Sequence, residues 1–203
     1  MLNLARLTDP GWAKAAVLWI DEILVEQAHL EKKAAAAALR FLFKYQDRAV
    51  IQQPLSALAR EELEHFEIVL GQLERRGLAF GPQHASPYAA GLISIVREDE
   101  RGRLIDSFLC SAMIEARSCE RMKLLGEALR ETDAELSELY KELVASEARH
   151  HSTYVKLLES MFPVDEVRRR LVEVAEHEAT VLERMPEMAR LHANAPSTAP
   201  IGA

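Results

Sequence analysis

Two Glu-x-x-His pairs lie on apolar helix faces of the sequence, at positions where a helix packed into a protein core usually carries leucine. The first pair is Glu62 with His65, and the second is Glu147 with His150. A Glu and a His three residues apart share one face of a helix, so both side chains can reach the same metal ion. The apolar residues that continue these faces at steps of three and four are Leu55, Leu58, Val69 and Leu73 for the first pair, and Leu139, Leu143, Tyr154 and Leu157 for the second.

Two further acids each interrupt an apolar helix face singly. Glu31 follows Ala28 by one helical turn, and Glu115 follows Ala112 in the same way. From Glu31 to the first pair is 31 residues, and from Glu115 to the second pair is 32 residues. The similar spacing predicts a helix hairpin that is used twice. Glu26 is the alternative to Glu31 as the acid of the first helix.

Four carboxylates in one core need a source of positive charge. Burying a single carboxylate costs several kcal/mol, so four together would exceed a typical total stability of roughly 5–15 kcal/mol. Two divalent cations would balance the four charges, and oxygen-rich sites with one imidazole per metal suit iron or manganese. The alternative is a metal-free helical bundle in which the acids pair with Arg117, Lys32 or Arg60. That alternative leaves unexplained why both Glu-x-x-His pairs replace core positions.

Helices must position these residues, and the sequence predicts an all-α fold whose core is four long helices. The expected helices span about residues 11–46 (in one or two pieces), 54–76, 87–97, 104–130, 132–162 and 165–191. Gly77 is expected to end the second of them, and Thr132 with Glu135 to cap the start of the fifth. We expect one domain over residues 1–192 and a disordered tail over 193–203, which is rich in Pro, Ser and Ala.

Composition excludes several classes of protein. With 49% hydrophobic and 28% charged residues and a net charge of −7, the chain is neither a disordered protein nor a basic protein that coats nucleic acid. Cys110 and Cys119 form no Cys-x-x-Cys pair, which favours a reducing, cytoplasmic location over a disulfide framework. The apolar stretch of residues 15–20 ends at Asp21, too short for a membrane span or an export signal.

The chain resembles the MiaE family of tRNA hydroxylases in four segments: HLEKKAAAAAL (29–39), LAREELEHFEIVLGQLERRG (58–77), FLCSAMIEARSCERMKLL (108–125) and ELVASEARHHSTYVKLL (142–158). These enzymes act on 2-methylthio-N6-isopentenyladenosine beside the anticodon. The resemblance implies a ferritin-like four-helix bundle with additional helices and a di-iron centre, with manganese as the alternative metal. The implied metal ligands are Glu31, Glu62, His65, Glu115, Glu147 and His150. The di-iron centre itself would be catalytic, with no separate acid or base.

The resemblance also implies partners. O2 would be the co-substrate, and the two electrons would come from an external electron-transfer protein or reductase, because the sequence has no dinucleotide-binding fingerprint. We expect a monomer or weak homodimer with no membrane contact. Phosphate contacts dominate RNA affinity, so tRNA needs a basic approach to the metals. The candidates for tRNA contact are Arg40, Lys44, Arg48, Arg97, Arg101, Arg103, Arg168, Arg169 and Arg170.

Two other functions use a similar core. One is iron oxidation in a ferritin-type storage shell, against which the additional helices count. The other is peroxide scavenging of the rubrerythrin or manganese-catalase type, although rubrerythrins commonly carry a Cys-x-x-Cys module that this chain lacks. His29, His151 and His177 lie off the metal faces and are expected at the surface, and Cys119 is expected as a small core residue.

Overall fold

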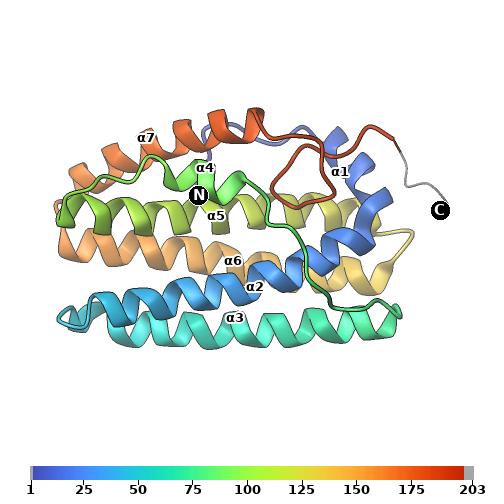
Figure 1. Cartoon of the computed structure of the whole chain (residues 1–203), viewed down its shortest axis with the longest axis horizontal. Coiled ribbons are helices and arrows are strands. Elements are labelled where there is room, and N and C mark those ends of the chain that lie inside the picture. Colours follow the sequence, from blue (N-terminus) through green and yellow to red (C-terminus); the bar gives the residue numbers. More distant parts are fainter. Residues whose placement is uncertain (1, 199–203) are drawn as a thin grey trace. The chain divides into compact units, whose positions relative to one another are not determined.

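The computed structural model describes residues 2–198, and the regular elements of this part are helical (Figure 1). They are α1 (Gly11–Ala16), the 3-10 helix η1 (Val17–Trp19), α2 (Ile20–Lys44), α3 (Ala49–Arg75), α4 (Tyr88–Ile93), α5 (Glu100–Leu129), α6 (Ala134–Met161) and α7 (Val164–Glu183). The all-α prediction is confirmed. The chain divides into two compact units, one of residues 20–84 and one of the remaining residues. A single domain over residues 1–192 stays a prediction.

The unit of residues 20–84 is a hairpin in which α2 packs along α3 (Figure 1). Ala28, Ala35 and Ala38 of α2 are fully or almost fully buried, and their small side chains allow a close approach of the two helices. Helix α3 begins at Ala49, before the expected start at Pro54. Pro54 lacks an N–H and removes one helical hydrogen bond, yet the helix continues through it, and Ile51 in the first turn is fully buried.

The end of α3 has the predicted form. Gly77 adopts a positive φ of 67°, which glycine tolerates without a steric penalty. Leu78 N–H then donates to Leu73 O at 2.9 Å, and Gly77 N–H donates to Glu74 O at 3.0 Å. This pattern satisfies carbonyls that the last helical turn leaves open, so the helix ends where the sequence indicates.

The second unit is built around α5, which packs against α1, α4, α6 and α7 (Figure 1). Its hairpin partner α6 starts one residue later than expected, because Asp133 rather than Thr132 provides the cap: its carboxylate accepts from Leu136 N–H at 3.0 Å. Gly126 brings the two helices together, since a Cβ there would lie 3.2 Å from Tyr140 Cβ. The α5–α6 contact therefore depends on the absence of a side chain at this position.

Helix α7 ends at Glu183, so the expectation of a helix to residue 191 is wrong. Pro186 explains the difference, because proline has no N–H to donate and restricts the residue before it. Beyond α7 the chain returns to the body of its own unit, where Leu191, His192 and Ala193 are buried. The disordered tail expected over 193–203 falls in part on residues 199–203, outside the described residues.

Within residues 2–198, every helix is too short or too polar to cross a membrane.

Candidate metal centre

The α2–α3 hairpin gathers one group of three possible ligands. Glu31 comes from α2, and Glu62 and His65 come from α3; one ligand atom from each lies within 4.8 Å of those of the others. His65 Nδ1 is 3.9 Å from Glu31 Oε2 and 3.7 Å from Glu62 Oε2. Two atoms that each bind a metal ion at about 2.1 Å are separated by at most about 4.2 Å. The spacing of this first triad therefore fits one ion between the three side chains.

The first triad is held by a buried amide. Gln27 lies one turn before Glu31, is fully buried, and donates from Nε2 to Glu31 Oε1 at 3.0 Å. Such a hydrogen bond fixes the orientation of a ligating carboxylate. Glu26 is also buried on α2, but the structure groups Glu31, not Glu26, with the two residues of α3.

The α5–α6 hairpin gathers the second triad. Glu115 comes from α5, and Glu147 and His150 come from α6; one ligand atom of each lies within 4.8 Å of the others. All three side chains are buried, with exposed fractions of 4%, 2% and 2%. Each hairpin thus presents two carboxylates and one imidazole, as its Glu and Glu-x-x-His spacing predicts.

The chemistry of these donors fits iron or manganese. Carboxylate oxygens with one imidazole nitrogen suit these metals, whereas closed zinc sites favour thiolates. Cys119 lies one turn after Glu115, but burial raises the pKa of its thiol to about 11. The protonated thiol donates to Val144 O at 3.4 Å and is a poor metal ligand.

The three cations of the metal-free alternative make contacts elsewhere. Arg117 pairs with Glu178 at 2.7 Å, and Lys32 Nζ lies 4.7 Å from the centre of the Phe80 ring. Arg60 donates to a serine hydroxyl on its own helix at 3.2 Å. These contacts disfavour a bundle in which the same cations neutralise the triads.

Three histidines expected at the surface are more enclosed than predicted. His151 is buried, and its Nδ1 lies 2.8 Å from Ala112 O. Burial lowers the pKa of His151, which keeps the ring neutral. His29 and His177 are half-buried, and the Nε2 of each lies within 3 Å of a glycine carbonyl. The periodicity of a helix identifies its apolar face. It does not show whether a distant segment of the chain covers the adjacent face, on which these histidines lie.

Two of the arginines proposed for tRNA contact instead hold a buried acid that helix periodicity does not reveal. Asp106 is fully buried, Arg97 Nη2 donates to its Oδ1 at 2.8 Å, and Arg170 Nε donates to the same oxygen at 2.9 Å. Burial alone would raise the pKa of Asp106, but the hydrogen bonds from Arg97 and Arg170 lower it. Both arginines therefore serve the packing of their own unit.

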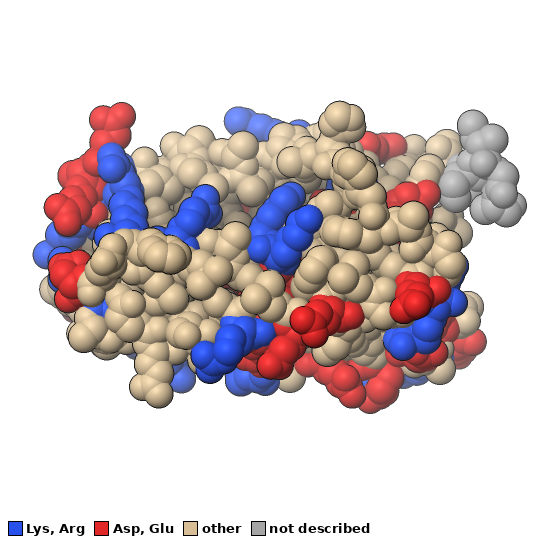
Figure 2. Space-filling view, turned by 60° about the horizontal axis from the view of Figure 1, so that its bottom comes forward, with Lys and Arg blue, Asp and Glu red and all other residues tan. Residues whose placement is uncertain are grey.

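The other candidates for tRNA contact are mostly exposed. Arg101 pairs with Glu166 and Arg168 with Glu159, while Arg103 donates to a backbone carbonyl. Figure 2 shows that lysine and arginine side chains on the face in view stand in small groups among uncharged and acidic residues. Arg48 also pairs with an acid, Asp47, at 3.4 Å, and the exposed candidates that remain are Arg40, Lys44 and Arg169; contact of all these residues with tRNA stays a prediction.

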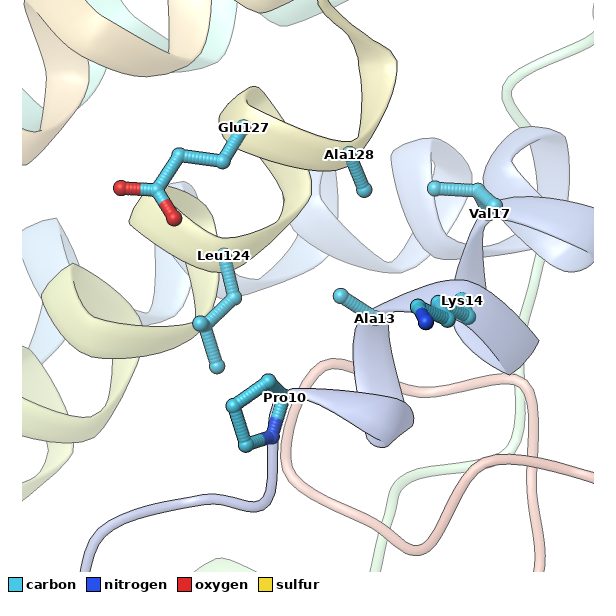
Figure 3. A pocket seen from close by; sticks show the side chains of 7 residues that line it. All are labelled: Pro10, Ala13, Lys14, Val17, Leu124, Glu127 and Ala128. Carbon is cyan, nitrogen blue, oxygen red and sulfur yellow. The ribbon is translucent and has the colours of Figure 1, made fainter.

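A surface hollow lies outside the two triads. It is formed where α1 and η1 approach the end of α5, and Figure 3 shows its lining of Pro10, Ala13, Lys14, Val17, Leu124, Glu127 and Ala128. Leu124 follows Glu115 by nine residues, which is about 14 Å along a helix. The hollow therefore belongs to another part of α5.

Two curated proteins and a solved structure are similar to this chain. A tRNA 2-(methylsulfanyl)-N(6)-isopentenyladenosine(37) hydroxylase from Pseudomonas putida is 36% identical over 189 residues, which cover 93% of this chain and 91% of that protein. A protein of the same name from Salmonella typhimurium is 35% identical over 140 residues, which cover 69% of this chain and 50% of that protein. This chain thus spans about half the length of the Salmonella protein.

The solved structure is that of Protein 43 with aldehyde deformylating oxygenase activity from Synechococcus. It is 41% identical, with a TM-score of 0.88, and the match covers 94% of this chain and 95% of that one. This likeness confirms the predicted ferritin-like fold class. The family model described as tRNA-(MS[2]IO[6]A)-hydroxylase (MiaE) matches residues 2–193. The chain belongs to the MiaE family of tRNA hydroxylases.

Proposed function

We propose that this chain hydroxylates the isopentenyl group of 2-methylthio-N6-isopentenyladenosine beside the anticodon of tRNA. The observation that carries the proposal is the presence of two buried Glu–Glu–His triads in a chain of this hydroxylase family. Two of its relatives are named for the same base. The tRNA substrate also supports a cytoplasmic location.

The two triads together would hold two iron ions. Their four carboxylates balance two divalent cations, and the six ligands would be Glu31, Glu62, His65, Glu115, Glu147 and His150. Manganese is the alternative metal. When bound, such a centre supplies the activation of O2, with two electrons from an external electron-transfer protein or reductase. We expect the enzyme to act as a monomer or weak homodimer.

The residues of the chain prepare this site in two ways. The burial of the triads keeps bulk water from the ligands, which strengthens the attraction between carboxylates and cations. The hydrogen bond from Gln27 holds one oxygen of Glu31 and leaves the other directed towards His65. Carboxylates can change their binding mode as the charge of a metal changes, whereas each imidazole offers a metal one nitrogen at a time.

Mass spectrometry of tRNA nucleosides tests the reaction. Cells that make the prenylated base but lack a hydroxylase would be compared with and without this chain. We expect the hydroxylated base only where the chain is expressed. Prenylated base that remains unmodified beside a folded, iron-loaded protein would overturn the proposal.

A matched pair of variants tests the ligands. Glu31→Ala should lose iron and hydroxylation, while Glu26→Ala, which alters another buried acid on the same helix, should keep about two metals per chain. Glu115→Ala, in the other hairpin, should likewise lose iron and hydroxylation. It should keep most of the helical circular dichroism signal. Two metals per chain in Glu31→Ala or Glu115→Ala would refute the ligand assignment.

A second candidate function comes from the Synechococcus structure, whose name states an aldehyde deformylating oxygenase activity. The iron-loaded protein would therefore also be given an aldehyde in place of tRNA. Formate release without any tRNA hydroxylation would favour this candidate. A large multi-subunit shell would favour iron storage, and rapid peroxide loss with the manganese form would favour peroxide scavenging.

A further inference from the structure

The outward side of α2 differs in charge from the chain as a whole. The chain carries a net charge of −7, yet residues 32–46 include four basic residues and no Asp or Glu. Lys33, Arg40 and Lys44 of α2 are exposed, as is Arg48 just after it. Arg48 Nε lies 3.4 Å from Asp47 Oδ2, which offsets part of its charge, whereas Lys33 and Arg40 form no ion pair within residues 2–198. We refer to these four exposed cations as the basic face of α2.

An aromatic side chain stands among these cations. Phe43 is 74% exposed, and it lies three residues after Arg40 and directly before Lys44. Residues three or four apart share one side of a helix, so Arg40 lies between the Phe43 ring and Lys44 on this side of α2. An exposed aromatic ring beside cations is the combination that binds single-stranded nucleic acid, in which bases stack on the ring and phosphates meet the cations.

The neighbouring helix α3 lacks this combination. Its exposed residues include Glu64, Glu67 and Glu74 as well as Arg60 and Arg75. On this surface the acidic side chains repel phosphate while the basic side chains attract it. The positive charge of this hairpin is therefore concentrated on α2.

The basic face also lies at a useful distance from the first triad. Arg40 and Phe43 follow Glu31 by nine and twelve residues, which correspond to about 14 and 18 Å along the helix axis. Glu31 is on the buried side of α2 and Phe43 on an exposed side. An RNA loop that places one base at the triad can then extend its neighbouring nucleotides along the same helix.

We propose that the basic face of α2 and Phe43 form the docking surface for the anticodon stem–loop of tRNA. The cations bind phosphates, and the Phe43 ring stacks on an unpaired base of the loop. This inference rests on the proposed function, because it assigns a binding surface to that reaction. It commits to RNA as the occupant. An acidic electron-transfer protein on the same surface is the competing outcome.

The test measures binding of a fluorescently labelled anticodon stem–loop to the iron-loaded protein over a range of salt concentrations. The double variant Arg40→Ala/Lys44→Ala should weaken binding at least about 10-fold and reduce the slope of log K against log salt by about 1 to 2. Phe43→Ala should weaken binding by about 5- to 150-fold with an unchanged slope, and Phe43→Tyr should restore most of it. The matched control, Arg60→Ala/Arg75→Ala on α3, should leave both quantities unchanged.

The outcomes separate this inference from the proposed function. If wild-type protein binds the stem–loop and hydroxylates tRNA while the α2 variants bind it equally well, the docking surface is wrong and the function stands. If wild-type protein neither binds nor hydroxylates tRNA, the proposed function is wrong, and the docking surface is wrong with it. If the α2 variants bind RNA normally but lose turnover only with a protein electron donor, the surface belongs to the donor and the inference is overturned.

Discussion

The two hairpins carry the same ligand pattern in different surroundings. Helix α5 packs against α1, η1, α4, α6 and α7 and carries fully buried charge such as Arg117, whereas α2 leaves a basic side exposed. The segment after α7 adds to the cover of α5, since Arg121 Nη1 donates to Leu191 O at 2.5 Å and to Ala193 O at 2.7 Å. The two hairpins can therefore share a ligand pattern without sharing a role. The α5–α6 hairpin is the packed scaffold of its unit, and the α2–α3 hairpin exposes the basic face of α2.

The scaffold role depends on a buried ion pair that joins three helices. Arg117 of α5 donates from Nη2 to Glu178 Oε2 of α7 at 2.7 Å, and the hydroxyl of Tyr88 of α4 donates to Glu178 Oε1 at 2.9 Å. Both members of the ion pair are fully buried. Removing one member of such a pair leaves the other charged group without compensation in the core.

Arg117→Ala should therefore have the largest effect on stability. We expect the free energy of unfolding in urea, followed by circular dichroism, to fall by about 3–5 kcal/mol. Arg168→Ala is the control, because its pair with Glu159 is exposed and worth about 0–1 kcal/mol. A loss below about 1 kcal/mol in Arg117→Ala would mean that the buried pair does not hold the scaffold together.

A smaller, pH-dependent effect is expected where the C-terminal segment covers α5. His192 is buried, its ring stacks on Tyr88 with a 4.6 Å separation between ring centres, and its Nε2 lies 3.1 Å from Ser118 Oγ. Burial first, and then the positive charges of Arg121 and Arg117, lower the pKa of His192 well below its usual 6.5.

The folded state therefore resists protonation of His192 while the unfolded state accepts it. This contribution to stability is complete above about pH 6.5 and is lost as the pH falls below that value, by up to about 1.4 kcal/mol per pH unit. Urea unfolding at pH 7.5 and 5.5 should show a smaller loss in His192→Gln than in wild type. Equal losses in the two proteins would show that the segment does not shield this ring.

The sequence predicts local features well because their causes are local. Each Glu-x-x-His pair follows from a spacing of three residues within one helix, and Gly77 ends α3 through its own backbone freedom. The end of α7 was missed although Pro186 marks it in the sequence. The burial of Asp106 and His151 does not follow from helix periodicity, because it depends on partners outside their own helices: Arg97 and Arg170 for Asp106, and Ala112 for His151.

The smallest expected effects compare one glycine from each hairpin. At Gly71 of α3, the only neighbour that a Cβ would meet is the flexible Arg75 Nη1 at 3.9 Å, so Gly71→Ala should stabilise the protein by about 0.5–1 kcal/mol. At Gly126 of α5, a Cβ would lie 3.2 Å from Tyr140 Cβ and 3.4 Å from Ser137 O, neither of which can move without shifting α6. The free-energy cost of overpacking at Gly126 should exceed the gain in helix propensity. Gly126→Ala should therefore destabilise the protein by about 1 kcal/mol.

The sign of these two changes, measured by thermal unfolding, sharpens the comparison more than their size. Opposite signs are expected only if α5 and α6 are in rigid contact while the face of α3 around Gly71 has room for a methyl group. Stabilisation by both substitutions would mean that α6 can move away from α5 at little cost. A hairpin that yields in this way would not be a rigid scaffold, and the assignment of separate roles to the two hairpins would then have to rest on surface charge alone.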